Sequence, residues 1–302
     1  MTSYTGRFAP SPTGPLHMGS LLAAMASWCD ARAHGGQWLL RIEDVDEVRT
    51  RPGAVDHIFS TLENCCLTWD GPVMVQSQRK ERYQDVLNQL QKKGQVFWCS
   101  CTRSELARTS VISVYPGTCR CHLLPEPDCA ARIRVTCPTA IPFNDRIFGE
   151  QAENPEQAVG DFVIRRRDGY FAYQLAVVTD DADQGVTHVV RGADLLDNTA
   201  RQIYLQQSLG FSTPGYAHLP LIINPNGEKL SKQTGALAID INQPTPSLWL
   251  CLDLLKQSPP PELKPASPGE LLAWAVKHWD ISAIPAQHFL AADRRIDVQA
   301  GY

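Results

Sequence analysis

Long apolar runs are missing from this sequence, and so is any excess of positive charge. No segment approaches the roughly 18–20 consecutive apolar residues of a membrane-spanning helix, and Met1 is followed by polar residues without the apolar core of a signal peptide. We therefore expect a cytoplasmic protein with no membrane partner. The 28 lysines and arginines are outnumbered by 32 aspartates and glutamates, which gives a net charge of −4. This balance argues against a general nucleic-acid binder but is compatible with a local basic groove.

Internal repeats are also absent, and the composition is that of an ordinary globular chain. The 302 residues are 43% hydrophobic and 20% charged. This length is enough for one large domain or two modest ones with a buried core. Ten cysteines are present. Because nothing marks the chain as secreted, their clustering favours metal binding or packing over disulfides.

Strands and helices alternate in the first third of the chain. An apolar segment around Phe8 is followed by a helical pattern over residues 20–36 and by a compact strand over 38–42. Two further helical patterns begin near Pro52 and span 78–93. This alternation predicts an α/β fold with a doubly wound, parallel, Rossmann-like sheet.

The pattern changes twice after this region, which suggests four segments. We expect the first half of a nucleotide-binding catalytic domain in residues 1–97 and an inserted subdomain in 98–160. The second half of the catalytic domain should follow in 161–240. Residues 241–302 should form a small helical C-terminal region, interrupted at 258–268 by a stiff, extended, proline-rich linker.

Residues 161–178 contain a turn signal and a basic triplet. The pair Asp168-Gly169 favours a hairpin turn, so we expect a strand on either side of it. The triplet RRR at 165–167 lies before that turn. It could contact RNA phosphates, but exposed strands also carry arginines for solubility, and the sequence leaves both interpretations open.

The loop that precedes the first helix has the composition of an anion-binding site. Residues 7–20 read RFAPSPTGPLHMGS, with prolines that stiffen the path and glycines that let the backbone approach a ligand. A strand that turns into a helix presents free backbone amides to an anion, and His17 lies just before the helix start. The alternative is a proline-rich loop with a packing histidine.

A second basic segment strengthens the anion-binding interpretation. Residues 229–232 read KLSK, and two lysines three residues apart on a loop suit mobile cations that close over a polyphosphate. The string is weak evidence alone, because lysine-rich surface loops are common. Paired with His17 about 210 residues upstream, it favours a nucleotide site.

At this point the sequence resembles a known family. HMGS (17–20) and KLSKQ (229–233) are similar to the two signatures of class I aminoacyl-tRNA synthetases. RFAPSPTGPLHMG (7–19), together with RIEDVD (41–46), resembles the glutamyl branch of these enzymes. Ser20 replaces a second histidine that many class I enzymes carry, and Gln233 replaces a serine. His17 and Lys232 are therefore left as the principal phosphate partners.

The resemblance implies an ATP-dependent ligase that activates an amino acid. The α-carboxylate of L-glutamate would attack the α-phosphate of ATP and release pyrophosphate, with Mg²⁺ sharing the charge. His17 and Lys232 would be catalytic, because donors aimed at the developing phosphoryl charge stabilise the transition state. The residues implied in ATP binding are Pro10, Gly14, His17, Gly19, Ser20, Lys229, Ser231 and Lys232.

Recognition of glutamate requires a fixed cation for its second carboxylate, which a planar arginine grips better than lysine. Arg7 and Arg191 are the candidates, against the alternative that each forms a structural salt bridge. The resemblance assigns the α-ammonium to Glu43. The residues implied in glutamate binding are Arg7, Ala9, Ser11, Glu43, Tyr173 and Arg191.

Four cysteines within residues 99–121 have the spacing of zinc ligands. Cys-x-Cys followed about twenty residues later by a second pair suits tetrahedral Zn²⁺, and spacing alone suggests four thiolates, with His122 as a further contender. The resemblance instead implies three cysteines and a tyrosine. The predicted ligands of one structural Zn²⁺ are therefore Cys99, Cys101, Tyr115 and Cys119. Cys121 is the rival of Tyr115, and packing without a metal is the alternative to both.

The segment that follows the second signature is short. No basic, aromatic-rich segment of the kind that stacks RNA bases is visible there, so we expect no separate anticodon-reading domain. This resembles the glutamyl-queuosine tRNA(Asp) synthetases, a family that attaches glutamate to the modified base queuosine in the anticodon of tRNA(Asp). The resemblance implies tRNA(Asp) carrying queuosine as the partner of a monomer that activates glutamate without tRNA. The alternatives are a minimal glutamyl-tRNA synthetase that charges a tRNA 3′ end, a nucleotidyltransferase that adenylates a small acid, and a non-catalytic paralogue.

Overall fold

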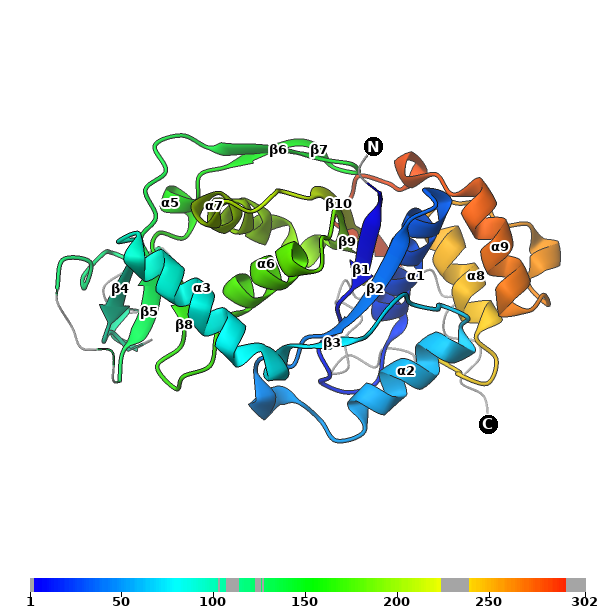
Figure 1. Ribbon diagram of the computed structural model, residues 1–302. Coiled ribbons are helices and arrows are strands. Elements are labelled where there is room, and N and C mark those ends of the chain that lie inside the picture. Colours follow the sequence, from blue (N-terminus) through cyan, green and yellow to red (C-terminus); the bar gives the residue numbers. More distant parts are fainter. Residues whose placement is uncertain are drawn as a thin grey trace.

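The computed structural model of the protein describes residues 3–102, 104–106, 114–122, 126, 128–223 and 239–291 (Figure 1). Its centre is a parallel sheet in two hydrogen-bonded parts. One part has the order β1-β2-β3 and the other β7-β6-β10-β9. The strands of these two parts are β1 (Thr5–Phe8), β2 (Gln37–Ile42), β3 (Met74–Val75), β6 (Ile141–Asp145), β7 (Gly149–Glu153), β9 (His188–Gly192) and β10 (Gly215–Leu219).

The two parts meet where β9 lies beside β1. The backbone N–H of Thr187, just before β9, donates to the carbonyl of Thr5 over 2.9 Å. β1 pairs in parallel with β2, and β10 pairs in parallel with both β9 and β6, whereas β7 runs antiparallel at the edge. The predicted α/β class with a parallel sheet is confirmed.

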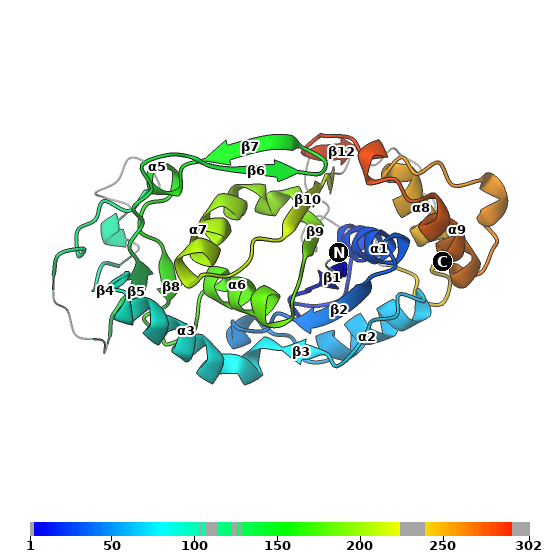
Figure 2. The ribbon, with the colours of Figure 1, turned by 45° about the horizontal axis from the view of Figure 1, so that its top comes forward.

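Helices pack around this sheet in two groups (Figure 2). The first core joins the side chains of α1 with those of β1, β2, α2, α8 and α9, and the second joins α3, α6 and α7 with β9 and with β5 (Ala130–Ile133). The helices are α1 (Met18–Ala33), α2 (Ala54–Asn64), α3 (Lys80–Lys92), α5 (Pro155–Ala158), α6 (Tyr173–Asp183), α7 (Thr199–Leu209), α8 (Thr245–Leu254) and α9 (Pro268–His278). The C-terminal helices therefore share a core with the first helix.

A smaller antiparallel sheet lies at the far end of the molecule from α8 and α9 (Figure 1). Its strands are β4 (Val96–Cys99), β5 (Ala130–Ile133) and β8 (Val163–Arg165), in the order β4-β5-β8. The chain between β4 and β8 covers the stretch in which the sequence predicts an insertion. A short parallel pair, β11 (Leu221–Ile223) and β12 (Phe289–Ala291), joins the chain after β10 to its C-terminal part.

The hairpin expected around Asp168-Gly169 is wrong in its second half. Only one bridge follows the turn, between Arg165 and Phe171, and the chain then enters α6 at Tyr173. Seven of the eleven residues of α6 are buried, so its apolar run has no exposed face and resembles a buried strand in sequence.

The proline-rich segment 258–268 also differs from expectation. It contains one turn of 3₁₀ helix, Pro261–Leu263, and the Trp249 indole N–H of α8 donates to the Pro260 carbonyl over 3.1 Å. The segment is thus partly folded against α8. No helix in the described part of the chain is long and apolar enough to cross a membrane.

Candidate active site

The loop between β1 and α1 is fixed by the strand beside it. The backbone N–H of Glu43, at the end of β2, donates to the Pro10 carbonyl over 3.0 Å, and that of Arg51 donates to the Pro12 carbonyl over 2.9 Å. Gly14 has a φ of 139°, which side-chain-bearing residues rarely adopt. The prolines and this glycine therefore form an ordered turn at the carboxyl edge of the sheet, where α/β folds bind ligands.

His17 caps the first turn of α1. Its Nδ1 accepts a hydrogen bond from the backbone N–H of Ser20 over 3.3 Å, and its Nε2 lies 3.2 Å from the Ser20 hydroxyl. Because Nδ1 accepts, the neutral ring carries its proton on Nε2, which makes that nitrogen a donor. A Cβ on Gly19 would lie 3.2 Å from the His17 ring, so glycine at this position leaves room for the imidazole.

A cleft of about 430 Å³ opens over this loop and the ends of β1, β9 and β10. It brings together every described residue to which the sequence assigns ATP or glutamate. These are Arg7, Ala9, Pro10, Ser11, Gly14, His17, Gly19, Ser20, Glu43, Tyr173 and Arg191. The cleft also has lining residues that the sequence motifs do not indicate: Thr13, Asp194, Leu195, Pro220, Leu221 and Ile222.

The second signature falls outside the described residues. Lys229, Ser231 and Lys232 belong to the stretch 224–238, which follows β11. Leu221 and Ile222 of β11 line the cleft.

Arg7 lines the cleft and is 4% exposed. Its Nε donates to Asp181 Oδ1 on α6 over 3.2 Å, and in the part of the chain that the structure describes no hydrogen bond involves its two Nη groups. Burial would raise the pKa of Asp181, but the charges of Arg7 and Arg41 lower it below its ordinary value. The ionised Asp181 thus orients Arg7 and leaves four N–H donors for a ligand.

Glu43 is paired with a second buried arginine. Its Oε1 accepts from Arg41 Nη2 over 3.2 Å, and the same nitrogen donates to Asp181 Oδ1 over 2.8 Å. Burial raises the pKa of Glu43, although the positive charges of Arg41 and Arg7 oppose this. A ligand cation beside this carboxylate would lower its pKa again and stabilise the ionised form.

Arg191 is more fully used by the protein than Arg7. Its Nε donates to His218 over 2.9 Å, its Nη1 to Gln202 over 2.7 Å, and its Nη2 to Thr199 over 2.9 Å and to the Leu195 carbonyl over 3.3 Å. Among the described residues, four of its five N–H groups thus have partners, which leaves one for the cleft. Nearby, burial raises the pKa of Tyr173 to about 12, so its hydroxyl stays protonated at neutral pH and can donate a hydrogen bond.

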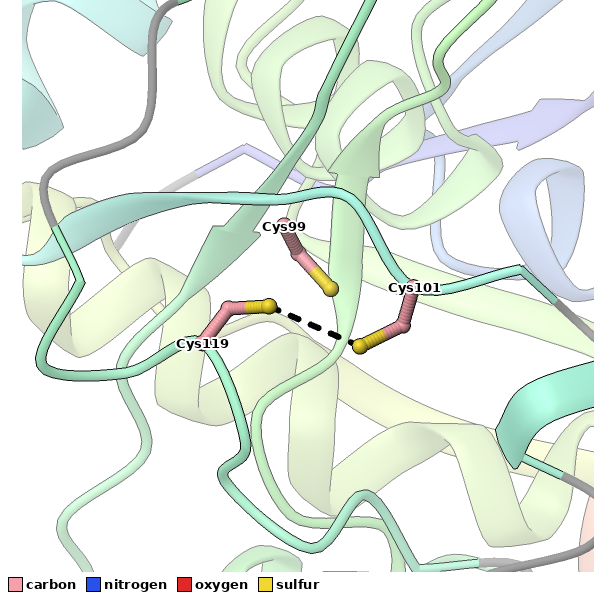
Figure 3. A group of neighbouring side chains, drawn as sticks. All are labelled: Cys99, Cys101 and Cys119. Atoms are coloured by element: carbon pink, nitrogen blue, oxygen red, sulfur yellow. Dashed lines mark hydrogen bonds between the residues drawn. The ribbon is translucent and has the colours of Figure 1, made fainter.

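Three cysteine sulfurs converge beside β4 (Figure 3). Cys99, Cys101 and Cys119 have their Sγ atoms within 4.8 Å of one another, and those of Cys101 and Cys119 are 3.5 Å apart. Sulfurs about 2.3 Å from a tetrahedral zinc would be about 3.8 Å apart, so the spacing fits a metal. Burial opposes ionisation, but a backbone hydrogen bond from Ser100 and contacts with Cys101 and Tyr115 lower the pKa of Cys119 to about 7.

Tyr115 adds an oxygen to this group. Its hydroxyl lies 3.4 Å from Cys99 Sγ and accepts the backbone N–H of Cys119 over 2.9 Å. The Arg132 guanidinium lies 3.9 Å above its ring. Cys121 is exposed and is not part of the three-sulfur group.

The basic triplet is paired within the protein. Arg165 contacts Glu126, Arg166 contacts Asp46 and Asp168, and Arg167 donates to the Ser100 carbonyl. These partners favour a structural role for the triplet without testing its contact with RNA.

The chain resembles known synthetases over nearly its whole length. Residues 4–246 match the family described as tRNA synthetases class I (E and Q), catalytic domain. The glutamate–tRNA synthetase of Elizabethkingia anophelis superposes with a TM-score of 0.81 and 27% identity, covering 96% of this chain and 68% of that one. A glutamate tRNA ligase from Elizabethkingia meningosepticum, solved with its amino acid, superposes with a TM-score of 0.80 and 28% identity. This match covers 94% of this chain and 66% of that one. The fold and the cleft define a class I tRNA synthetase catalytic domain.

Relatives with higher sequence identity indicate a particular family within this class. A glutamyl-Q tRNA(Asp) synthetase from Aromatoleum aromaticum is 53% identical over 288 residues, which cover 94% of this chain and 91% of the relative. One from Thiobacillus denitrificans is 53% identical over 291 residues, which cover 95% of this chain and 96% of the relative. The chain belongs to the glutamyl-Q tRNA(Asp) synthetase family, as its motifs predict.

Proposed function

We propose that this chain activates L-glutamate with ATP and transfers the glutamyl group to queuosine in the anticodon of tRNA(Asp). One observation supports the activation of glutamate: Arg7, Glu43 and the helix-capping loop line the same cleft. A carboxylate grip, an ammonium partner and a phosphate cradle are the three sites that formation of glutamyl-adenylate needs. The relatives that are 53% identical are glutamyl-Q tRNA(Asp) synthetases, which supports transfer of the glutamyl group to queuosine.

In the proposed complex, Arg7 holds the side-chain carboxylate of glutamate. Its two Nη groups have no partner in the described part of the chain, so they suit a bidentate carboxylate contact, and Arg191 adds at most one further N–H. Glu43 takes the α-ammonium. Ala9, Ser11 and Tyr173 complete the wall of this subsite.

ATP binds across the loop and the start of α1 in this proposal. Pro10, Gly14, Gly19 and Ser20 form the backbone cradle, and the amides of the first turn of α1 face the phosphates. His17 donates from Nε2 to a phosphoryl oxygen. Lys229, Ser231 and Lys232, with Mg²⁺, neutralise the polyphosphate, and Lys232 acts in the transition state.

Cys99, Cys101, Tyr115 and Cys119 hold a structural Zn²⁺ in this proposal. Three thiolates and one phenolate oxygen are ligands that Zn²⁺ accepts, and their spacing suits a closed tetrahedral site. The metal would link the end of β4 to the segment after it. The cytoplasmic location and the monomeric state remain predictions from the sequence.

Labelled glutamate, ATP and tRNA(Asp) with or without queuosine provide the decisive experiment. We expect label only on the queuosine-containing tRNA, and glutamate-dependent ATP–pyrophosphate exchange without any tRNA. Label on both tRNAs would favour charging of the 3′ end, and exchange without label on either would favour adenylation of a small acid. Absence of both exchange and label would indicate a non-catalytic paralogue. Lys232→Ala should abolish exchange, and a variant that exchanges normally would remove this lysine from the mechanism.

A further inference from the structure

A buried chain of hydrogen bonds lies behind the cleft. Asp145 at the end of β6, His218 on β10 and Arg191 on β9 come from three adjacent strands. Asp145 Oδ2 lies 2.6 Å from His218 Nδ1, and His218 Nε2 accepts from Arg191 Nε over 2.9 Å. Asp145 is 1% exposed and His218 is 0% exposed, so water cannot substitute for either partner. Of these three residues, only Arg191, at one end of the hydrogen-bonded series, lines the cleft.

Asp145 and Arg191 both favour the same tautomer of the histidine. A guanidinium nitrogen can only donate, so His218 Nε2 must be an acceptor and the single ring proton must be on Nδ1. That proton is donated to Asp145. Burial lowers the pKa of His218, and the hydrogen bond to Asp145 only partly opposes this, which is consistent with a neutral ring.

Asp145 is itself held in one orientation. Its Oδ1 accepts three backbone N–H groups, those of Ile147 over 3.0 Å, Phe148 over 2.9 Å and His218 over 3.3 Å. Oδ2 therefore faces His218. The turn after β6 thus determines which imidazole nitrogen carries the proton, and through it where Arg191 points.

We propose that Asp145 and His218 are positioning residues for glutamate binding, which they support by holding Arg191 in the cleft through a fixed histidine tautomer. This inference rests on the proposed function, since it assigns Arg191 to the glutamate subsite. Neither residue touches the substrate. Their effect is transmitted by the contact between His218 Nε2 and Arg191 Nε. The Thr199 hydroxyl, which accepts from Arg191 Nη2 over 2.9 Å, also lies 3.3 Å from His218 Nε2.

Asp145→Asn tests the proposal sharply. The three backbone N–H groups require an acceptor, so the amide oxygen takes the Oδ1 position and the NH₂ faces His218 Nδ1. Nδ1 must then accept, the proton moves to Nε2, and Nε2–H meets the N–H of Arg191. We expect the glutamate KM in ATP–pyrophosphate exchange to rise about tenfold, the size of one lost charge-assisted hydrogen bond, with little change in the ATP KM.

The imidazole ¹⁵N signals of histidine-labelled protein give a readout that is independent of activity. We expect His218 to be protonated on Nδ1 in the wild type and on Nε2 in Asp145→Asn. A wild-type ring protonated on Nε2 would overturn the inference even if the variant did not fold. An unchanged tautomer in a folded Asp145→Asn variant would also overturn it.

Asp161→Asn is the matched control. Asp161 is also buried and accepts a backbone N–H, that of Val135 over 2.8 Å, but it does not line the cleft. It should lower thermal stability without changing the glutamate KM; an equal rise in both variants would indicate a merely structural effect. If the wild type shows no glutamate-dependent exchange, the proposed function fails, while the tautomer measurement still decides whether Asp145 controls His218.

Discussion

Two arginines face the same cleft, and the protein uses their donors very differently. Arg7 gives one N–H to Asp181, whereas Arg191 gives four to His218, Gln202, Thr199 and the Leu195 carbonyl. A residue whose donors are occupied contributes shape and charge, and one with free donors contributes hydrogen bonds. The side-chain carboxylate of glutamate should therefore depend more on Arg7 than on Arg191.

Arg7→Lys tests this difference. A lysine keeps the charge, but its compact ammonium cannot contact Asp181 and a carboxylate in the bidentate manner of a guanidinium. We expect the glutamate KM in ATP–pyrophosphate exchange to rise about 10- to 100-fold, which corresponds to roughly 1.4–2.7 kcal/mol. Arg82→Lys is the control, because Arg82 pairs with Asp183 at the surface and does not line the cleft. An unchanged KM in Arg7→Lys would assign the carboxylate to another residue.

Among the elements, α6 was the hardest to predict, and it carries part of the site. The loop residues and Glu43 were predictable because they are nearly contiguous in two short motifs. Asp181 was not, because α6 is buried on most sides and its sequence LAVV has no helical period. Its partners Arg7 and Arg41 are more than 100 residues away in the chain, and no local pattern indicates such a contact. The parallel strands β1 and β2 were predictable because each is short, apolar and followed by a helical pattern, whereas β6 and β10 are each followed by another strand.

The segment after β4 is the element that should bind metal. We expect about one zinc per chain in the purified protein, and Cys119→Ser should lose most of it because a buried thiolate is removed. Metal analysis and competition with a chromophoric chelator would measure this. Tyr115→Phe should weaken zinc binding, and the exposed Cys121→Ser should retain it. Retention of zinc by Tyr115→Phe, together with loss of zinc from Cys121→Ser, would establish four thiolate ligands.

At the scale of the whole molecule, Asp30 on α1 joins parts that are far apart in the sequence. Its carboxylate accepts from the Tyr4 hydroxyl, from Arg146 Nη2 over 3.0 Å and from the Trp279 indole over 3.0 Å. Tyr4 precedes β1, Arg146 follows β6, and Trp279 follows α9. Burial would raise the pKa of Asp30, but the hydrogen bond and charge of Arg146, aided by Tyr4 and Trp279, lower it.

This lowered pKa of Asp30 makes the free energy of unfolding depend on pH in the acidic range. Because the folded-state pKa of Asp30 lies below its unfolded value, its contribution is present above about pH 4 and is lost as the pH falls through the folded-state pKa. Asp30→Asn should lower the free energy of unfolding at pH 7 by about 2–4 kcal/mol and reduce the loss of Tm between about pH 5 and pH 3. Thermal unfolding against pH measures both. The exposed Asp253→Asn should behave like the wild type, and an Asp30→Asn curve parallel to the wild-type curve would contradict the assignment.

The two backbone hydrogen bonds that tie the loop after β1 to the chain around β2 also bear on binding entropy. With three prolines and these ties, the loop has few alternative conformations in the ligand-free protein. Ordering a flexible backbone costs about 1–2 kcal/mol per residue, and a ligand that meets an ordered loop avoids that loss. Part of the affinity for the substrates is therefore determined when the chain folds, before either of them binds.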